Sequence, residues 1–298
     1  MNNLSFKSGF VTIIGRPNVG KSTLINNIVG EKILIISNKP QTTRNKIQTV
    51  YNGEDTQIVF LDTPGIHKPK NRLGEHMVRA AKDTLNEVDV ILFLVDDSTT
   101  IGPGDKYILE LLRDVKTAVI LGINKIDIME PSAFKSIYDT YSEYDVFDDI
   151  IGLSAINGKN IEKLIEKISD KLPEGPQYFP ADMITDQPER FIVSEIIREK
   201  LLHYLHEEIP HGVAVVVNLM RKREGKDIID VDVTIYCERK SHKAIIIGKN
   251  GKKIKGVGKS SREEIERLLG SKVYMEIWVK VKKDWRDKEN MLRNFGYD

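Results

Sequence analysis

Several features that mark other classes of protein are scarce or absent in this sequence. Cys237 is the only cysteine among the 298 residues, which excludes an internal disulfide and fits a reducing compartment. It lies in an alternating apolar run, which favours a small core residue over a nucleophile. The longest apolar run, residues 88–95, contains Asp89 and is far shorter than the roughly 20 residues of a membrane-spanning helix. The first nine residues lack the pattern of a secretory signal, so we expect a cytoplasmic protein that crosses no membrane.

The charge is balanced overall but unevenly distributed. The chain has 45 Lys and Arg and 44 Asp and Glu, a net charge of +1. Residues 191–298 hold 23 basic and 17 acidic side chains, whereas residues 1–190 hold 22 basic and 27 acidic ones. A composition with 40% hydrophobic and 30% charged residues is typical of globular domains. The asymmetry predicts two domains with different tasks.

The first 172 residues alternate short apolar runs with helical patterns. This alternation predicts a parallel sheet with helices on both faces. The expected buried strands are residues 10–14, 57–61, 88–95, 118–123 and 150–153, with an extra strand at 45–51 that pairs with 57–61. The expected helices are residues 22–29, 75–85, 106–112, 131–141 and 160–171.

A change of pattern divides the chain near residue 172. Residues 172–188 contain four prolines and one glycine without periodicity, which predicts a linker at 173–188 between domains 1–172 and 189–298. Beyond it we expect a helix at 189–206, strands at 213–220 and 228–237, a helix at 241–247, a second helix ending near 269 and a strand at 272–281.

A phosphate-binding loop follows the first expected strand and opens the first expected helix. In the pattern GxxxxGK[ST], backbone N–H groups and the helix N-terminus attract phosphate. Lys21 is expected to bridge the β- and γ-phosphates, and the Ser22 hydroxyl to ligate Mg²⁺. The segment assigned to nucleotide binding comprises Gly15, Arg16, Pro17, Asn18, Val19, Gly20, Lys21, Ser22 and Thr23.

Three further motifs stand at the ends of expected strands, where ligands bind in open α/β sheets. A carboxylate at Asp127 accepts from two guanine N–H groups that adenine does not offer together, so an ATPase is disfavoured. Asp62 can hold the magnesium shell, and Gly65 can present its N–H to the γ-phosphate. The backbone of Ser154 and Ala155 is expected to reach guanine O6. The nucleotide-binding residues of these motifs are Asp62, Thr63, Pro64, Gly65, Asn124, Lys125, Asp127, Ser154 and Ala155.

The C-terminal part carries the GxxG pattern of a KH domain. Two expected helices flank a loop whose glycines allow an RNA backbone to approach closely. From residue 239 to residue 262 there are nine Lys and Arg and no Asp or Glu, a strong electrostatic footprint for RNA. The alternative is that the GxxG residues only end a helix and form a turn, and that the basic side chains around them are a solvated charged surface. The residues assigned to RNA binding are Ile247, Gly248, Lys249, Asn250, Gly251, Lys252 and Lys253.

With these motifs, the sequence resembles the Era family of translational GTPases. The resemblance rests on PNVGKS, KPQTTR at residues 39–44, DTPG followed by Ile-His, and the KH-like C-terminus, and it covers nearly the whole chain. It implies a doubly wound α/β P-loop GTPase sheet followed by an α+β type II KH domain. It also implies GTP and GDP as ligands, and binding to small-subunit ribosomal RNA near its 3′ end in maturation of the small ribosomal subunit.

The resemblance also implies site roles. Thr43 is expected on Mg²⁺ together with Ser22 and Asp62, with Thr42 as the other choice, and Lys21, Thr43 and Gly65 are the expected catalytic groups. Ile66 stands where Ras-like enzymes carry a water-positioning glutamine, so catalysis is expected to be mainly electrostatic.

The roles of Asn18 and His67, the oligomeric state and membrane contact are further expectations. Asn18 is the expected ligand of an activating K⁺, or else merely caps the loop, and His67 is either chemically active or a surface switch residue. We expect a monomer. Contact with the inner face of the cytoplasmic membrane follows only from the resemblance, because no anchor is visible. The alternative function is an RNA-binding module that uses GTP only as a structural ligand.

Overall fold

The computed structural model describes residues 6–37, 39, 42–65 and 71–297. The chain divides into two compact units. The first comprises residues 1–34, 43–69 and 74–186, and the second comprises residues 35–42, 70–73 and 187–298. No helix within the described ranges is long and apolar enough to cross a membrane.

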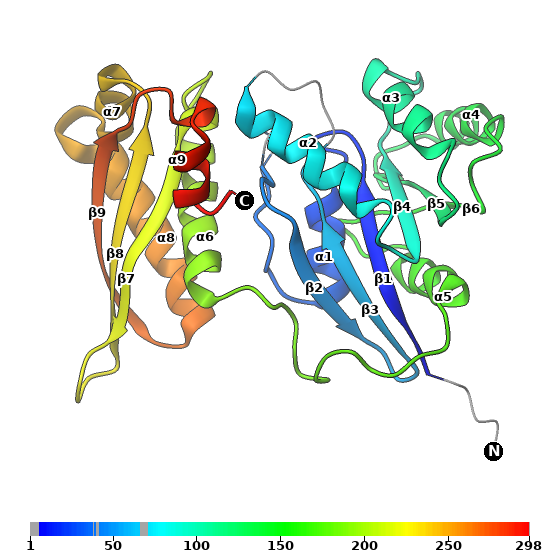
Figure 1. The fold of residues 1–298 in the computed structure, drawn as a ribbon, viewed down its shortest axis with the longest axis horizontal. Helices are drawn as coiled ribbons and strands as arrows, with labels where there is room; N and C mark the ends of the chain where they lie inside the picture. Colours follow the sequence, from blue (N-terminus) through cyan, green and yellow to red (C-terminus); the bar gives the residue numbers. More distant parts are fainter. Residues whose placement is uncertain (1–5, 38, 40–41, 66–70, 298) are drawn as a thin grey trace. The chain divides into compact units, whose positions relative to one another are not determined.

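A six-stranded sheet forms the centre of the first unit (Figure 1). Its strand order is β2-β3-β1-β4-β5-β6, with β2 antiparallel to β3 and every other neighbouring pair parallel. Because β1, β3, β4 and β5 are covered on both sides, most of their residues are buried, and β4 and β5 are apolar throughout. The strands are β1 Lys7–Ile14, β2 Ile47–Asn52, β3 Thr56–Asp62, β4 Val90–Val95, β5 Ala118–Ile123 and β6 Asp149–Gly152.

Five helices of the first unit connect these strands or follow them. In Figure 1, α2 lies in front of the sheet and α1 lies behind it, so both faces are covered, as the alternating pattern predicts. The apolar side chains of β4, β5, α3 and α4 join one buried cluster that includes Phe93 and Tyr141. The helices are α1 Lys21–Val29, α2 Arg72–Thr84, α3 Pro103–Leu112, α4 Pro131–Ser142 and α5 Ile161–Lys171.

The proline-rich stretch expected to be a linker runs along the first unit as far as Asp186. Buried Gln57 holds it, because its side-chain oxygen accepts from the backbone N–H groups of Tyr178 and Phe179 at 2.8 and 3.0 Å. Further along, the Val50 N–H donates to the carbonyl of Ile184 at 2.7 Å. These contacts satisfy backbone groups that prolines and the edge strand β2 would otherwise leave unpaired.

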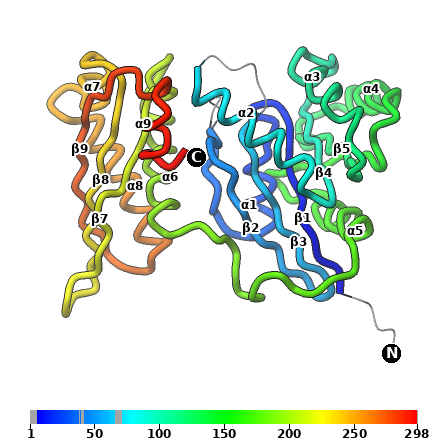
Figure 2. The backbone as a smooth tube through the Cα atoms, in the orientation of Figure 1, coloured from blue at the N-terminus to red at the C-terminus, as the bar shows by residue number. Residues whose placement is uncertain are grey.

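The second unit is built on a three-stranded sheet of order β7-β8-β9. β7 runs antiparallel to β8, and β9 runs parallel to β8. Figure 2 traces the connection from β8 to β9 through α7 and α8. Cys237 is fully buried in the core of this unit, as its apolar surroundings predict. The main elements are α6 Glu189–Tyr204, β7 Ala214–Lys222, β8 Ile228–Cys237, α7 Lys240–Ile247, α8 Lys252–Leu269 and β9 Lys272–Val281.

The C-terminal residues form two short elements that the sequence pattern did not predict. They are a 3₁₀ turn at Trp285–Asp287 and a helix α9 at Glu289–Asn294. Trp285 is fully buried, and its indole N–H donates to the Gly212 carbonyl at 3.0 Å. Its ring packs edge-on against Phe295, which in turn stacks on Tyr236 of β8 at 4.7 Å between centroids. Aromatic packing therefore orders this highly charged end of the chain.

Candidate functional site

The phosphate loop occupies the turn between β1 and α1. Gly15 and Gly20 have φ angles of 155° and 105°, a region that side-chain-bearing residues rarely adopt. The buried Lys21 ammonium donates to the carbonyls of Gly15 and Arg16, both at 3.1 Å. Burial lowers the pKa of Lys21 to about 8, although the charge of Asp62 opposes the shift. The lysine is thus held under the loop whose N–H groups are suited to phosphate.

Ser22, Thr43 and Asp62 converge beside Lys21 and fit a magnesium site. Asp62 Oδ2 accepts from Ser22 Oγ at 3.3 Å and from Thr43 Oγ1 at 3.1 Å. The two hydroxyl oxygens are themselves 3.3 Å apart. Asp62 is fully buried, and its Oδ1 has no hydrogen-bond partner among the described residues. Oxygen ligands of this kind, together with nucleotide phosphates, are what Mg²⁺ prefers.

The same residues explain the electrostatics of the site. Burial raises the pKa of Asp62 to about 6, even though the charge of Lys21 and the hydrogen bonds from Thr43 and Ser22 favour the ionised form. A divalent cation at this position restores a full negative charge on such a carboxyl group. The donor set therefore fits a hard cation.

The structure separates Thr43 from Thr42. Thr43 is buried beside Asp62, whereas the Thr42 hydroxyl donates to the Lys39 carbonyl at 2.6 Å. Among the two threonines, the one next to the magnesium cluster is therefore Thr43. Ile66 and His67 lie outside the described residues, but Gly65 is described, and a Cβ built on it would lie 3.1 Å from Pro17 N. Gly65 thus lies directly against the phosphate loop.

The base-recognition motifs meet at the ends of β5 and β6. Asp127 Oδ1 accepts from Ser154 Oγ at 2.6 Å. Asn124 is buried and bridges two loops, because its amide donates to the Val19 carbonyl at 2.8 Å and its oxygen accepts from the Ala155 N–H at 2.9 Å. A Cβ on Gly20 would lie 2.2 Å from the Asn124 amide nitrogen, so that glycine also makes room for the bridge.

These contacts show which polar atoms of the two motifs the fold already pairs. The Ala155 N–H, which was expected to reach guanine O6, is paired with Asn124. Asn124 bonds to the protein through both ends of its amide, so it fastens the phosphate loop to the loop that follows β6. A motif match cannot show this, because it does not reveal which polar atoms the fold already satisfies.

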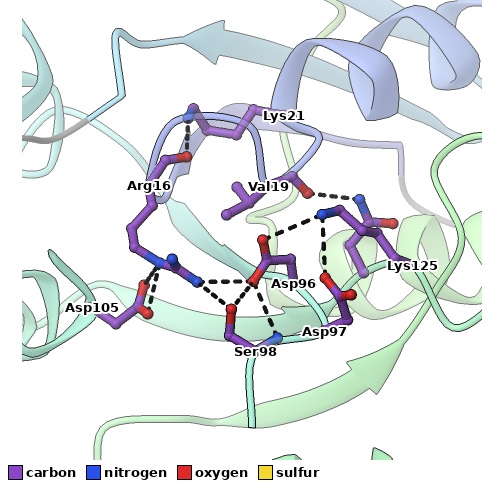
Figure 3. A network of polar contacts seen from close by, with 9 residues as sticks. Arg16, Val19, Lys21, Asp96, Asp97, Ser98, Asp105 and Lys125 are labelled. Atoms are coloured by element: carbon purple, nitrogen blue, oxygen red, sulfur yellow. Dashed lines mark hydrogen bonds and ion pairs between the residues drawn. The ribbon is translucent and has the colours of Figure 1, made fainter. Parts of the chain in front are cut away.

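The side chain of Arg16 turns away from the phosphate loop (Figure 3). Its guanidinium forms ion pairs with Asp96 after β4 and with Asp105 in α3, both at 2.8 Å. The Asp96 carboxylate also accepts from Lys125 of the base-recognition motif at 3.3 Å.

Asn18, the expected ligand of K⁺, also lies on the phosphate loop. Its side chain is exposed, and its backbone has a left-handed φ of 70°.

The GxxG loop lies between α7 and α8. Gly248 and Gly251 have φ angles of 72° and 74°, and Asn250 between them has a φ of 52°. A Cβ on Gly248 would meet the Cβ of Lys253 at 2.7 Å, whereas the space around Gly251 is open. The loop therefore depends on glycine for two reasons: close packing at Gly248 and a left-handed conformation with open space at Gly251.

The side chains around this loop are mostly exposed and basic. Lys249, Asn250 and Lys252 face solvent at the N-terminus of the 18-residue helix α8, whose partial positive charge adds to that of the lysines. Of the preceding isoleucines, Ile246 is fully buried, and Ile247 packs against the core of the unit. Ile247 thus joins the start of the loop to the core of the unit.

Two buried charged residues of α6 were not expected from the sequence. Arg198 and Glu199 are each only 1% exposed, and both contact the segment 35–42 of their own unit. Glu199 accepts from the Ile36 N–H at 2.9 Å, and Arg198 donates to the Thr42 carbonyl. The local sequence does not predict their burial, because they differ from other charged residues on helices only in the distant residues that they contact.

Comparison with known proteins places both units in described families. Residues 10–125 match the family described as 50S ribosome-binding GTPase, and residues 208–286 match the KH domain family. The chain is 64% identical to GTPase Era of Alkaliphilus oremlandii, across 99% of this chain and 100% of that protein. It is 60% identical to GTPase Era of Clostridioides difficile, across 98% and 99%.

Two solved structures agree with this chain over almost their whole length. One is a variant of Aquifex aeolicus Era bound to GDP·AlF4⁻, and the other is Era in complex with MgGDPNP and nucleotides 1506–1542 of 16S ribosomal RNA. Each has a TM-score of 0.94 and 42% sequence identity, and each comparison covers 98% of this chain and 99% of the other.

The fold and the site together define a P-loop GTPase that carries a KH domain. The predicted fold class is thereby confirmed, both for the doubly wound sheet and for the α+β unit that follows it. With full-length identities of 60% and more, the chain belongs to the Era family of GTPases.

Proposed function

We propose that this GTPase is a switch that binds small-subunit ribosomal RNA through its KH domain and acts in maturation of the small ribosomal subunit. The observation that carries the proposal is the presence, in one chain, of the cluster Ser22, Thr43 and Asp62 beside Lys21 and of an exposed basic GxxG loop. The solved complex of Era with MgGDPNP and 16S ribosomal RNA supports both halves. We assign residues 1–172 to the GTPase domain, 173–188 to the linker and 189–298 to the KH domain.

The nucleotide half of the proposal assigns a role to each group. Ser22 and Thr43 supply hydroxyl oxygens and Asp62 a carboxylate for Mg²⁺, which neutralises charge on the phosphates when it is bound. Lys21 contributes a positive charge to the β- and γ-phosphates, and Gly65 contributes an N–H to the γ-phosphate. Catalysis is then mainly electrostatic, through groups that the fold already holds in place.

Base selection rests on Asp127 and Lys125. The Ser154 hydroxyl donates to Asp127 Oδ1, which orients the carboxylate to which we assign the two guanine N–H groups. Asn18 is the proposed ligand of an activating K⁺, because its exposed side chain stands on the phosphate loop in a fixed left-handed turn.

The RNA half of the proposal rests on shape and charge. Gly248 and Gly251 contribute no side chains, so the loop backbone is accessible at both ends, and Lys249, Lys252 and Lys253 bring positive charge to an RNA backbone. The N-terminus of α8 adds backbone N–H groups.

Ribosomal RNA as the partner implies action in the cytoplasm. A peripheral membrane contact and a monomeric state are proposed from the resemblance to the family.

The proposal is tested by measuring RNA affinity and nucleotide turnover on one preparation. A 3′-terminal fragment of 16S ribosomal RNA should crosslink to Lys249 or Lys252 when GTP is bound. Thr43→Ala should raise the Mg²⁺ concentration needed for hydrolysis, whereas Thr42→Ala, its neighbour with a different hydrogen bond, should have a smaller effect. A protein that hydrolyses GTP but ignores this RNA would refute the RNA half alone.

A further inference from the structure

Arg16 connects the phosphate loop to two other parts of the first unit (Figure 3). Its Nε donates to Asp105 Oδ1 at 2.8 Å. A terminal nitrogen donates to Asp96 Oδ1 at 2.8 Å and to Ser98 Oγ at 3.3 Å. Its backbone carbonyl accepts from Lys21 at 3.1 Å. One residue therefore contacts the phosphate-binding lysine, the start of α3 and the end of β4.

Asp105 makes this anchor strong. Its side chain is 1% exposed and lies in the first turn of α3. Burial raises the pKa of Asp105 above its usual range, although the charge of Arg16 and its hydrogen bond oppose the shift. A buried carboxylate that loses its cation is strongly disfavoured, so the Arg16 side chain is firmly held at this end.

Asp96 extends the link to the guanine end of the site. Its Oδ1 accepts from Arg16, and its Oδ2 accepts from Lys125 at 3.3 Å. Burial alone would raise the pKa of Asp96, but the Ser98 hydrogen bond and the charges of Arg16 and Lys125 leave it below its usual value. The ionised carboxylate thus joins a residue of the phosphate loop to a residue of the base-recognition loop.

Gly104 provides the space for this arrangement. A Cβ built on Gly104 would lie 3.0 Å from Arg16 Cγ and 3.1 Å from Arg16 Cδ. Gly104 lies within α3, where glycine lowers helix stability relative to alanine. Its φ is outside the left-handed range, so backbone conformation does not require glycine there. A side chain at this position would have to push the Arg16 Cγ and Cδ atoms aside by a few tenths of an ångström.

We propose that Arg16 is a positioning residue that preorganises the phosphate loop for GTP and GDP by anchoring it to α3 through Asp105 and to the base-recognition loop through Asp96. The inference rests on the nucleotide site assigned in the proposed function. Because the guanidinium points away from the loop, Arg16 acts through the loop backbone and not by contact with phosphate. Preorganisation of this kind strengthens binding without a new contact to the ligand.

The first test separates binding from turnover. Arg16→Met should weaken binding of both GDP and GTP about tenfold, because both nucleotides need the same loop. The kcat at saturating GTP should stay within about twofold, and Arg16→Lys should recover part of the affinity. A lower kcat with unchanged affinity would overturn the positioning role, and so would wild-type affinity for both nucleotides in a folded Arg16→Met protein.

The second test does not depend on removing a buried charge. Gly104→Ala should weaken nucleotide binding in the same direction by displacing Arg16, whereas Gly102→Ala, where a Cβ meets nothing within 4 Å, should not. In an Arg16→Ala background, Gly104→Ala should have no further effect on affinity, because the Cγ and Cδ atoms that it would displace are gone. Additive effects would overturn the inference. A wild-type protein that failed to release phosphate from GTP would instead refute the proposed function.

Discussion

The two glycine loops of this protein are suited to phosphate in different ways. In the phosphate loop the charged groups are already paired: buried Lys21 donates to loop carbonyls, and partly exposed Arg16 forms ion pairs with Asp105 and Asp96. In the GxxG loop, Lys249 and Lys252 are exposed beside open glycine backbone. The first loop is built for one ligand in one geometry. The second offers charge and access, which suits a long polyanion and makes its affinity dependent on salt.

The largest expected effect comes from the open loop. Replacing both Gly248 and Gly251 by Asp should reduce RNA affinity about a hundredfold, because each change puts a side chain and a negative charge where an RNA backbone approaches. GTP binding should not change. The measurement is RNA binding at fixed salt, after circular dichroism has shown that the variant is folded.

A matched control isolates the loop from simple backbone strain. Gly251→Asp alone can be compared with Gly225→Asp, since both glycines have left-handed φ angles, of 74° and 65°, and a Cβ added at either would meet nothing within 4 Å. Only Gly251→Asp should weaken RNA binding. Equal RNA affinity for wild type and a folded Gly248→Asp, Gly251→Asp protein would leave the basic run as no more than a solvated face.

Asp127→Asn should shift base preference from guanine toward xanthine. The carboxylate accepts from two guanine N–H groups, and xanthine has a carbonyl where guanine has its amine, so an amide donor suits it better. Because the amide oxygen of asparagine can still accept one bond, the loss of one charge-assisted hydrogen bond, about 2 kcal/mol, predicts about thirtyfold weaker GTP binding. Competition between GTP and XTP measures the change. A variant that keeps its GTP affinity and ignores XTP would remove the assignment of Asp127.

Lys21→Ala should lower nucleotide binding or hydrolysis at least about tenfold, on the order of 1.4 kcal/mol. The reason is the loss of a buried charge from beneath the phosphate loop. Lys116→Ala, at an exposed position, serves as the control and should behave as wild type. Unchanged rate and affinity in Lys21→Ala would exclude the loop from the mechanism.

The smallest effect concerns the monovalent cation. Asn18→Ala should abolish stimulation by K⁺, a change of a few fold, while slow basal hydrolysis remains. Because Asn18 has a φ of 70°, Asn18→Gly should be compared, since glycine removes the amide without straining the backbone. Equal wild-type rates in Na⁺ and K⁺ would remove the proposed potassium site altogether.

The fold was largely predictable because its strands and helices follow simple patterns. The strands Ile228–Cys237 and Lys272–Val281 have the bounds expected from alternation, and the motifs indeed lie at strand ends. Helix α9 was missed because its sequence is short and charged, and it is ordered by Trp285 and Phe295 from outside the helix.

The site was predictable in its residue types but not in its partners. The cluster of Ser22, Thr43 and Asp62 forms as expected. The bridging role of Asn124 and the outward turn of Arg16 were missed, because each depends on contacts with residues far away in the sequence. A motif shows which groups are available, whereas the fold decides which of them remain free for the ligand.

The most direct test of the account is the release of phosphate from GTP in Mg²⁺ and K⁺, with and without a 3′-terminal 16S ribosomal RNA fragment. The same preparation should be assayed for binding of that RNA. The account predicts steady multiple-turnover release that Lys21→Ala reduces, together with RNA binding that the Gly248→Asp, Gly251→Asp protein loses. Tight GTP binding without phosphate release would contradict it, because GTP would then be only a structural ligand of an RNA-binding protein.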